Sequence, residues 1–473
     1  MPLVEFQECR LGALVVQDSA LSPRISAEGV KSSKVSARYH LQLSPLGERT
    51  RHRVTVRLMP YLMLVYLFAY IDRANISVAK LKMQGDLGFD DSLIGFGAGI
   101  FFVGYFLLEV PSTLTVERWS ARKLLSLIMI VWGLVAVGCG FIQTRNQFVI
   151  LRFLLGAAES GFFPGVIVYL SHWYRFEDRA RAKTYFMMTQ PLAILIGVGL
   201  SRWILETVYW RGLASWRWVF ILEGIPPILL GIFSFFYLTD RPSDAHWLEQ
   251  EEKNWLNSAL TEEAKEREAA GRVKILAALR HPYTLLLILI YFFITSGNQG
   301  LIFFLPSVID EMKQLTVTTR TVMTMLPYVL GFFTILLVGM SAQRTGERRW
   351  HIAGPVLFGG TTLLAAIAAG HHTAWVLVFF ILTMGTSQAF LPAFWTMPTS
   401  YLGKSAAATA VGLINSFGSL GGFMGPYVFG YLRTATGSWR AGLLALSGFC
   451  FISGSLALGI RKRSTLHFEH DKT

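Results

Sequence analysis

Four charged residues of this 473-residue chain lie inside long apolar stretches, where charge is expensive. Asp72 and Arg73 are adjacent in one stretch, and Arg152 and Glu159 lie seven residues apart in another. A charge at mid-membrane costs about 3 kcal/mol or more, so each is a candidate functional residue. Arginine offers a planar fork of donors that suits a carboxylate, and a carboxyl group can carry a proton. Protonation removes a negative charge, so an anion then binds more easily beside the arginine.

Helical spacing predicts which of these side chains share a face. Arg152 and Glu159 are two turns apart, about 10.5 Å along one helix. Asp72 shares a face with Asn75, three residues on, whereas Arg73 points about 100° away. One member of the adjacent pair can therefore face a central cavity while the other faces a neighbouring helix. The alternative is a structural ion pair, for example between Asp72 and Arg152.

The stretches that position these charges are long enough to cross a membrane. The chain is 53% hydrophobic and 15% charged, whereas an average soluble protein is about 25% charged. Each stretch approaches the roughly 20 residues that cross a bilayer as a helix. The pattern predicts an all-α polytopic membrane protein with twelve transmembrane helices, at 58–79, 93–114, 124–142, 148–173, 184–205, 218–238, 283–309, 322–340, 352–370, 374–397, 406–431 and 441–460.

The twelve stretches fall into two groups of six around a charged linker. Its stretch Glu249–Ala270 favours a helix on the membrane surface, with a regulatory contact as the alternative. The predicted parts are a disordered cytoplasmic tail, an N-terminal half, a cytoplasmic linker, a C-terminal half and a second cytoplasmic tail, at 1–57, 58–238, 239–282, 283–460 and 461–473.

The net charge of +13 has a topological explanation. With the N-terminal tail inside, 31 of the 43 Lys and Arg residues fall on that side of the predicted membrane, against 9 on the other. Positive residues collect on the cytoplasmic side, so both termini are expected there. This distribution accounts for the basic balance without a nucleic-acid partner.

Two short basic loops repeat 226 residues apart. Residues 117–123 read ERWSARK and residues 343–349 read QRTGERR. Both resemble the loop signature of the major facilitator superfamily, in which two six-helix halves enclose a site at the membrane midplane. That signature usually has Asp first and Gly fourth, and Gln343 replaces its acid in the second loop. The resemblance implies conformational roles for Glu117, Arg118, Arg122, Arg344 and Arg348.

Three further motifs resemble one branch of that superfamily, the anion:cation symporter family. They are AYIDRANISVA at Ala69–Ala79, RFLLGAAESGFFP at Arg152–Pro164 and GLINSFGSLGGFMGP at Gly412–Pro426, which resemble its first, fourth and eleventh spans. The family includes carriers of sugar acids, tartrate, phthalate and sialic acid. The similarity covers about 57–462, nearly the whole chain outside the N-terminal tail.

The resemblance implies roles for individual residues. Arg73 is expected to contact the substrate, and Asp72 and Glu159 to carry protons. The position of Arg152 within an apolar stretch, independent of the resemblance, makes it the expected charge partner. Tyr105, Gln190 and Asn415 are implied as polar substrate contacts, and helix–helix hydrogen bonding is the alternative for each. Further substrate-binding candidates are Asn298, which lies 226 residues after Asp72, and Trp395, for which packing is the alternative. Glu109 and Glu223 lie near span ends and are expected to contact loops or headgroups.

The sequence hypothesis is a secondary active transporter. It would move a small organic anion (a sugar acid, tartrate or aromatic acid) by proton symport with alternating access. Sodium-coupled and exchange carriers are alternatives, and a membrane-embedded enzyme or transporter-like sensor is more remote. The ten histidines lie in tails, loops or span ends, and no phosphate-binding Gly-x-x-x-x-Gly-Lys-Ser/Thr motif is present. No enzyme activity, cofactor or metal is expected.

Two expectations concern the setting of the chain. One chain already holds two complete halves, so a monomer suffices. The predicted topology favours a bacterial inner membrane, with a eukaryotic plasma membrane as the alternative.

Overall fold

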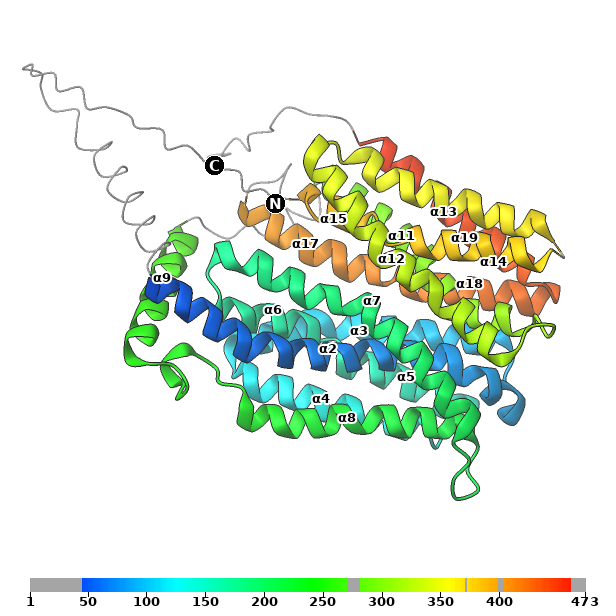
Figure 1. Cartoon of the computed structure of the whole chain (residues 1–473), viewed down its shortest axis with the longest axis horizontal. Coiled ribbons are helices and arrows are strands. Elements are labelled where there is room, and N and C mark those ends of the chain that lie inside the picture. Colours follow the sequence, from blue (N-terminus) through cyan, green and yellow to red (C-terminus); the bar gives the residue numbers. More distant parts are fainter. Residues whose placement is uncertain (1–44, 270–280, 371, 399–403, 461–473) are drawn as a thin grey trace, which may run out of the picture.

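The helices of this protein run alongside one another in two bundles (Figure 1). The structure, a computed structural model, describes residues 45–269, 281–370, 372–398 and 404–460. Within these ranges the chain is helical, with short connections and without strands. The prediction of an all-α polytopic fold is confirmed.

The N-terminal bundle is formed by seven helices, because the fourth predicted span is divided at Ser160 and Gly161 into two. They are α2 (Pro45–Leu87), α3 (Asp91–Arg118), α4 (Ala121–Cys139), α5 (Arg145–Glu159), α6 (Phe162–Trp173), α7 (Phe176–Thr207) and α8 (Ser215–Tyr237). A 3-10 turn, η1 (Pro242–Asp244), and the helix α9 (Gln250–Ala269) follow.

The C-terminal bundle repeats this arrangement. Its helices are α11 (Pro282–Asp310), α12 (Val317–Thr345), α13 (Arg349–Ala369), α14 (Thr373–Thr386), the short α15 (Leu391–Phe394), α17 (Lys404–Ser419), α18 (Gly421–Thr436) and α19 (Trp439–Leu458).

Eleven segments of the described chain are long and apolar enough to cross a membrane. The predicted span at 406–431 is not among them, because it forms α17 and α18, each of 16 residues. These two helices meet at Leu420, whose backbone stays in the right-handed helical region. The amide of Leu420 donates to the carbonyl of Phe417, and the amide of Met424 donates to the carbonyl of Leu420. The two helices therefore follow one path through the bundle.

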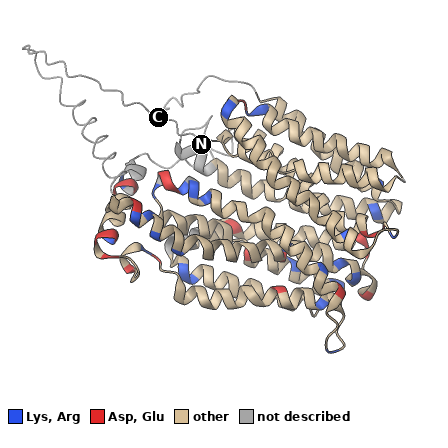
Figure 2. Ribbon diagram, in the orientation of Figure 1, with Lys and Arg blue, Asp and Glu red and all other residues tan. Residues whose placement is uncertain are grey.

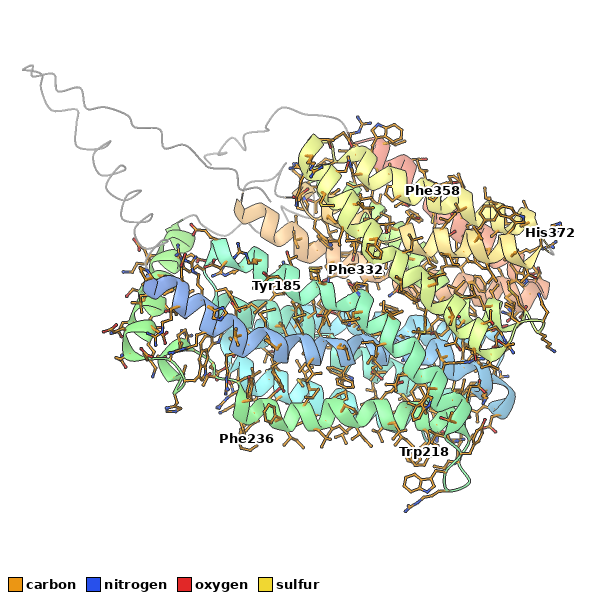
Figure 3. The ribbon with its side chains drawn as sticks, viewed as in Figure 1. Tyr185, Trp218, Phe236, Phe332, Phe358 and His372 are labelled. Atoms are coloured by element: carbon orange, nitrogen blue, oxygen red, sulfur yellow. The ribbon has the colours of Figure 1, made fainter. Side chains whose placement is uncertain are left out.

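Large apolar side chains cover the outside of the bundles. Phe236 of α8 is 78% exposed and Phe358 of α13 is 44% exposed, and both lie at the surface in Figure 3. Lys, Arg, Asp and Glu gather at the two ends of the bundles and on α9, and the C-terminal bundle carries none along its middle (Figure 2). This distribution matches a bilayer around the middle of the molecule and water at its ends.

The first helix is longer at both ends than the predicted span 58–79. It begins at Pro45, so residues 45–57 are helical and the prediction of a disordered tail is wrong for them. Arg53 donates to Glu252 of α9 over 2.6 Å, and Arg49 pairs with Glu249, the residue before α9, so the start of α9 provides acidic partners for the basic first turns. The rest of the predicted tail, residues 1–44, lies outside the described residues.

The linker helix predicted at Glu249–Ala270 is present as α9 (Gln250–Ala269). It packs against the start of α2 and lies at one end of the N-terminal bundle (Figure 1), here called the α9 end. Arg179, just inside α7, also pairs with Glu263 of α9 over 2.7 Å. The linker is therefore attached to the N-terminal bundle.

The two bundles meet along three sets of helices. Helix α3 packs on α17 and α18, α7 packs on α12, and α2 packs on α11. Toward the end opposite α9, here called the far end, one apolar cluster draws residues from both bundles, including Ile76, Met83, Phe304 and Phe429. The other two clusters of the described chain each stay within one bundle. The bundles therefore share a core only toward the far end.

Ion pairs join the bundles at this same far end. Arg202 of α7 pairs with Asp310 of α11 over 2.9 Å, and Asp91 of α3 pairs with Arg433 of α18 over 2.8 Å. The backbone amide of Ser92 also donates to the Thr434 hydroxyl over 2.9 Å. In the part of the chain that the structure describes, the far end is thus closed by both apolar and ionic contacts.

Close approach of α3 and α5 depends on Gly156. A Cβ added there would lie 1.8 Å from the Phe101 carbonyl oxygen. Alanine normally stabilises a helix interior by about 1 kcal/mol relative to glycine. At this position the clash reverses the sign, so we expect Gly156→Ala to lower the melting temperature of the detergent-purified protein by several degrees.

Gly448 of α19 is the matched control, because a Cβ there meets no atom within 4 Å. Gly448→Ala is expected to keep or raise the melting temperature. Equal melting temperatures for the two variants would contradict the packing of α3 on α5.

Candidate functional site

The centre of the N-terminal bundle holds an ion pair between two membrane helices. Arg73 of α2 donates from Nε to Glu159 Oε1 at the end of α5, over 2.7 Å. The Glu159 side chain is fully buried, whereas the Arg73 side chain is 22% exposed. The acid is therefore held inside the protein, while the arginine remains accessible on one side.

Aromatic rings surround the Arg73 guanidinium. Its carbon lies 5.1 Å from the ring centroids of Tyr70 and Tyr105, and 5.6 Å from that of Phe101. Phe101 also lies 5.2 Å from the guanidinium carbon of Arg152. Cation–π contacts of this kind hold a charge in a water-poor place while leaving its hydrogen-bond donors available. The structure therefore brings the predicted residues Arg73, Tyr105 and Glu159 together.

Asp72 points to a second cluster, as the spacing predicted. Its Oδ1 accepts a hydrogen bond from Asn75 Nδ2 over 2.9 Å, so the two side chains share a face. Arg152, which is 3% exposed, donates to the carbonyl oxygen of Gly97 over 3.3 Å. Asp72 and Arg152, both in the described chain, form no ion pair within 4 Å. The structure therefore does not contain the direct pair that was the alternative for these two residues. The charge pair that joins α2 to α5 is Arg73 with Glu159.

Glu223 was expected near loops or headgroups, and the structure contradicts this. Its side chain is 1% exposed and accepts a hydrogen bond from Ser201 of α7 over 2.8 Å. Helix α8 begins at Ser215, two turns before Glu223, and packs tightly on α4 and α2. This packing removes the carboxyl from the lipid surface and places it in the interior of the bundle.

Glu109 was also misplaced by the sequence interpretation. It is 6% exposed, and its two carboxylate oxygens accept hydrogen bonds from Asn415 and Ser416 of α17, each over 2.7 Å. Loops and headgroups therefore do not account for its contacts, because α17 of the other bundle packs on this part of α3. Glu109 follows Tyr105 by four residues, and this spacing already places both on one helix face.

The remaining predicted substrate contacts lie in or next to the C-terminal bundle. Gln190 of α7 donates to Gln388, which follows α14, over 3.3 Å. Asn298 of α11 is half-buried, and its Oδ1 has no hydrogen-bond partner among the described residues. Trp395 contacts the rings of Tyr291 and Phe394 within its own bundle, an arrangement that fits packing. Gln190 and Asn415 thus join the two bundles, and Asn298 keeps an unused acceptor.

The two basic loops occupy equivalent places, between α3 and α4 and between α12 and α13. In the first, Asp240 accepts hydrogen bonds from the Ser120 hydroxyl over 2.6 Å and from the Arg122 amide over 2.9 Å. Asp240 thereby satisfies one amide donor in the first turn of α4. The side chains of Glu117 and Arg118 lie outside the described part of the structure.

In the second loop, Gly346 ends α12 with a φ of 66° and Arg348 precedes the first turn of α13. Arg344 is exposed near the end of α12. Glu347 accepts a hydrogen bond from the Trp350 amide over 2.9 Å and so caps α13. The conformational roles predicted for these loops stay predictions.

The model of the Major Facilitator Superfamily matches residues 62–426, with a second match at 322–470. The chain belongs to the major facilitator superfamily. Members of this superfamily are transporters, so the chain is a transporter and not an enzyme.

Curated relatives match this superfamily member over most of their length. A protein of Agrobacterium vitis named for tartrate transport is 38% identical over 89% of this chain and 93% of the relative. A quinolone resistance transporter of Acinetobacter baumannii is 35% identical over 83% and 91%. The inner membrane transport protein RhmT of Escherichia coli is 34% identical over 87% and 95%.

Solved structures support the fold of the superfamily. A bacterial homologue of the human lysosomal transporter Spinster, in an inward-facing unoccupied conformation, matches with a TM-score of 0.71 and 17% identity, over 86% of this chain and 96% of that one. The Escherichia coli xylose transporter XylE matches with a TM-score of 0.68 and 14% identity, over 86% and 99%. At these identities the likeness concerns the fold alone.

A double-mutant cycle can measure the interaction energy of the Arg73–Glu159 pair separately from the effect of each single substitution. Removing one partner of a buried pair costs about 3–5 kcal/mol, because the other charge stays buried alone. We expect Arg73→Gln to destabilise the purified protein to denaturant. The double variant with Glu159→Gln is expected to recover part of that loss, since two neutral amides can hydrogen bond to each other. Additive losses in the cycle would mean that the two groups do not interact.

Proposed function

We propose that this superfamily member is a proton-coupled symporter of a small organic anion, with a carboxylate as the group recognised. The observation that carries the proposal is the Arg73 side chain, which is 22% exposed although its guanidinium is paired with a buried glutamate. A guanidinium has five N–H donors in a fixed fork, so a carboxylate substrate can bind donors that Glu159 leaves free. The name of the Agrobacterium relative, tartrate transporter, supports a carboxylate substrate.

Coupling follows from the balance of charge around Arg73. The four central residues Asp72, Arg73, Arg152 and Glu159 contribute two negative and two positive charges when all are ionised. A bound anion adds one negative charge that the apolar surroundings disfavour. Uptake of one proton by Glu159 restores the balance and releases the guanidinium for the substrate. Asp72, hydrogen-bonded to Asn75 on the other face of α2, is the second proposed proton carrier.

The orientation proposed for the membrane assigns the α9 end to the cytoplasm. The excess of Lys and Arg on that side of the chain supports it, as does the charged α9 helix. The far end, closed by ion pairs and a shared core, then faces outward. We propose a bacterial inner membrane as the location, in line with the bacterial relatives.

The proposal is tested by reconstituting purified protein in liposomes. Binding is screened first, by the thermal shift that tartrate, sugar acids and aromatic acids produce. Uptake of the best ligand is then measured under an imposed proton gradient, a sodium gradient or with an internal counter-anion. Proton symport predicts stimulation by an inward proton gradient alone. Equal uptake with and without that gradient contradicts coupling and favours facilitated diffusion. Stimulation by sodium or by the counter-anion favours the respective alternative.

Arg73 is expected to be essential for uptake. Arg73→Ala removes the guanidinium donors that are proposed to bind the carboxylate, and we expect uptake to fall to the level of empty liposomes. Arg211→Ala, in an exposed loop, is the control for loss of an arginine and is expected to leave uptake unchanged. Substantial uptake by Arg73→Ala would move the substrate site elsewhere.

Glu159→Gln is expected to separate binding from coupling. Glutamine keeps an acceptor for Arg73 but holds no exchangeable charge, so the anion competes with a weaker partner. We expect anion binding to be retained or tightened, while uptake loses its stimulation by the proton gradient. Glu262→Gln on the exposed face of α9 is the matched control. A Glu159→Gln variant with normal proton stimulation would assign the proton to another group.

A further inference from the structure

One buried cation of α2 other than Arg73 plays no part in the proposed mechanism. Lys80 lies one residue beyond the predicted span 58–79, yet its side chain is fully buried in the structure. Its ammonium nitrogen has no hydrogen-bond partner among the described residues. The nitrogen lies 3.6 Å from the ring centroid of Phe304 and 4.5 Å from that of Phe303. Aromatic rings of α11, in the other bundle, are therefore what covers this charge.

Other charges near Lys80 are satisfied by their own partners. Asp91 accepts from Arg433 over 2.8 Å and from Gln84 over 2.9 Å. Lys82, two residues further along α2, donates to the carbonyl oxygen of Leu205 over 2.7 Å. The contrast within one helix turn singles out Lys80 as a buried ammonium without an acceptor.

The position of Lys80 relates it to Arg73. Seven residues separate them, which places both on one face of α2 about 10.5 Å apart. Lys80 is nearer to the far end, and it faces the rings of α11 where Phe304 stacks on Phe429 of α18 at 4.3 Å. It therefore lies in the contact between bundles, between Arg73 and the Asp91–Arg433 pair.

A buried ammonium needs acceptors that aromatic rings replace only in part. Opening of the far end would separate α2 from α11, remove the rings and expose the ammonium to water. An anion entering from that side would then meet Lys80 before it reached Arg73. The residue is thus covered in the closed far end and available in the open one.

We propose that Lys80 is a carboxylate-binding residue on the outer part of the transport path, used when the far end is open. The inference rests on the proposed function, because it assumes an anionic substrate and alternating access. It assigns α2 two cationic positions on one face, with Lys80 as the outer and Arg73 as the central one.

The test compares three variants in intact cells, by the uptake of the carboxylate that gives the best thermal shift in the screen described above. Lys80→Met places an apolar side chain of similar length among the rings, so folding is expected to be preserved. We expect it to raise the KM for uptake about tenfold, since one charge-assisted contact is lost. Lys80→Arg keeps the charge and is expected to stay within about threefold of the natural KM. Lys82→Met is the matched control, and its KM is expected to be unchanged.

A second measurement tests directly whether position 80 becomes exposed to water on the outer side. Lys80→Cys is expected to react with a membrane-impermeant thiol reagent added outside the cells, and the unmodified protein, with its native cysteines, gives the background. If the variant still transports but does not react, the claim that position 80 becomes exposed on the outer side is overturned.

The outcomes separate this inference from the proposed function. Unchanged KM for Lys80→Met, or an equal defect in Lys80→Arg and Lys80→Met, would overturn the role of Lys80 while anion transport stands. A natural protein that takes up no carboxylate would overturn both.

Discussion

An arginine inside an apolar bundle must find a negative partner, and this requirement organises the middle of the molecule. The Arg73–Glu159 pair joins α2 to α5 and draws the rings of Tyr70 and Tyr105 around the guanidinium. Because the acid is enclosed and the base is accessible, a ligand would interact with the cation first. The middle of the C-terminal bundle contains no charged side chain, so its polar contribution there comes from amides, hydroxyls and aromatic rings. Charge is thus concentrated in one half of the superfamily fold.

The contacts between the bundles differ between the two ends. At the far end a shared apolar cluster and two ion pairs hold the bundles together. Further along, toward α9, the bundles are joined by hydrogen bonds from Asn415 to Glu109 and from Gln190 to Gln388, and by the ring contact of Phe106 with Phe417 at 5.3 Å. Hydrogen bonds between polar side chains can exchange for water at modest cost, whereas a shared apolar core must be exposed to open. The structure is therefore closed most firmly at the far end.

Much of the fold follows from apolar run length, and part of the site follows from helical spacing. Runs of about 20 residues located the helices, and the three-residue spacing of Asp72 and Asn75 predicted their shared face. Partners between helices were beyond this reasoning, because spacing within one helix carries no information on which neighbour packs against it. Glu109 and Glu223 looked peripheral for that reason. Lys80 lies just outside the predicted span 58–79 because the apolar run stops before it, although α2 continues to Leu87.

Helix α2 connects the two polar clusters of the N-terminal bundle. Asp72 faces Asn75 within the bundle, and Arg73, about 100° around the helix, faces Glu159 and the accessible side. A small rotation or tilt of α2 would change both environments at once, because adjacent residues share one rigid backbone. A proton on one face and an anion on the other can therefore influence each other without direct contact. This geometry supports the proposed coupling, because an Asp and an Arg on separate helices would each need their own mechanical link.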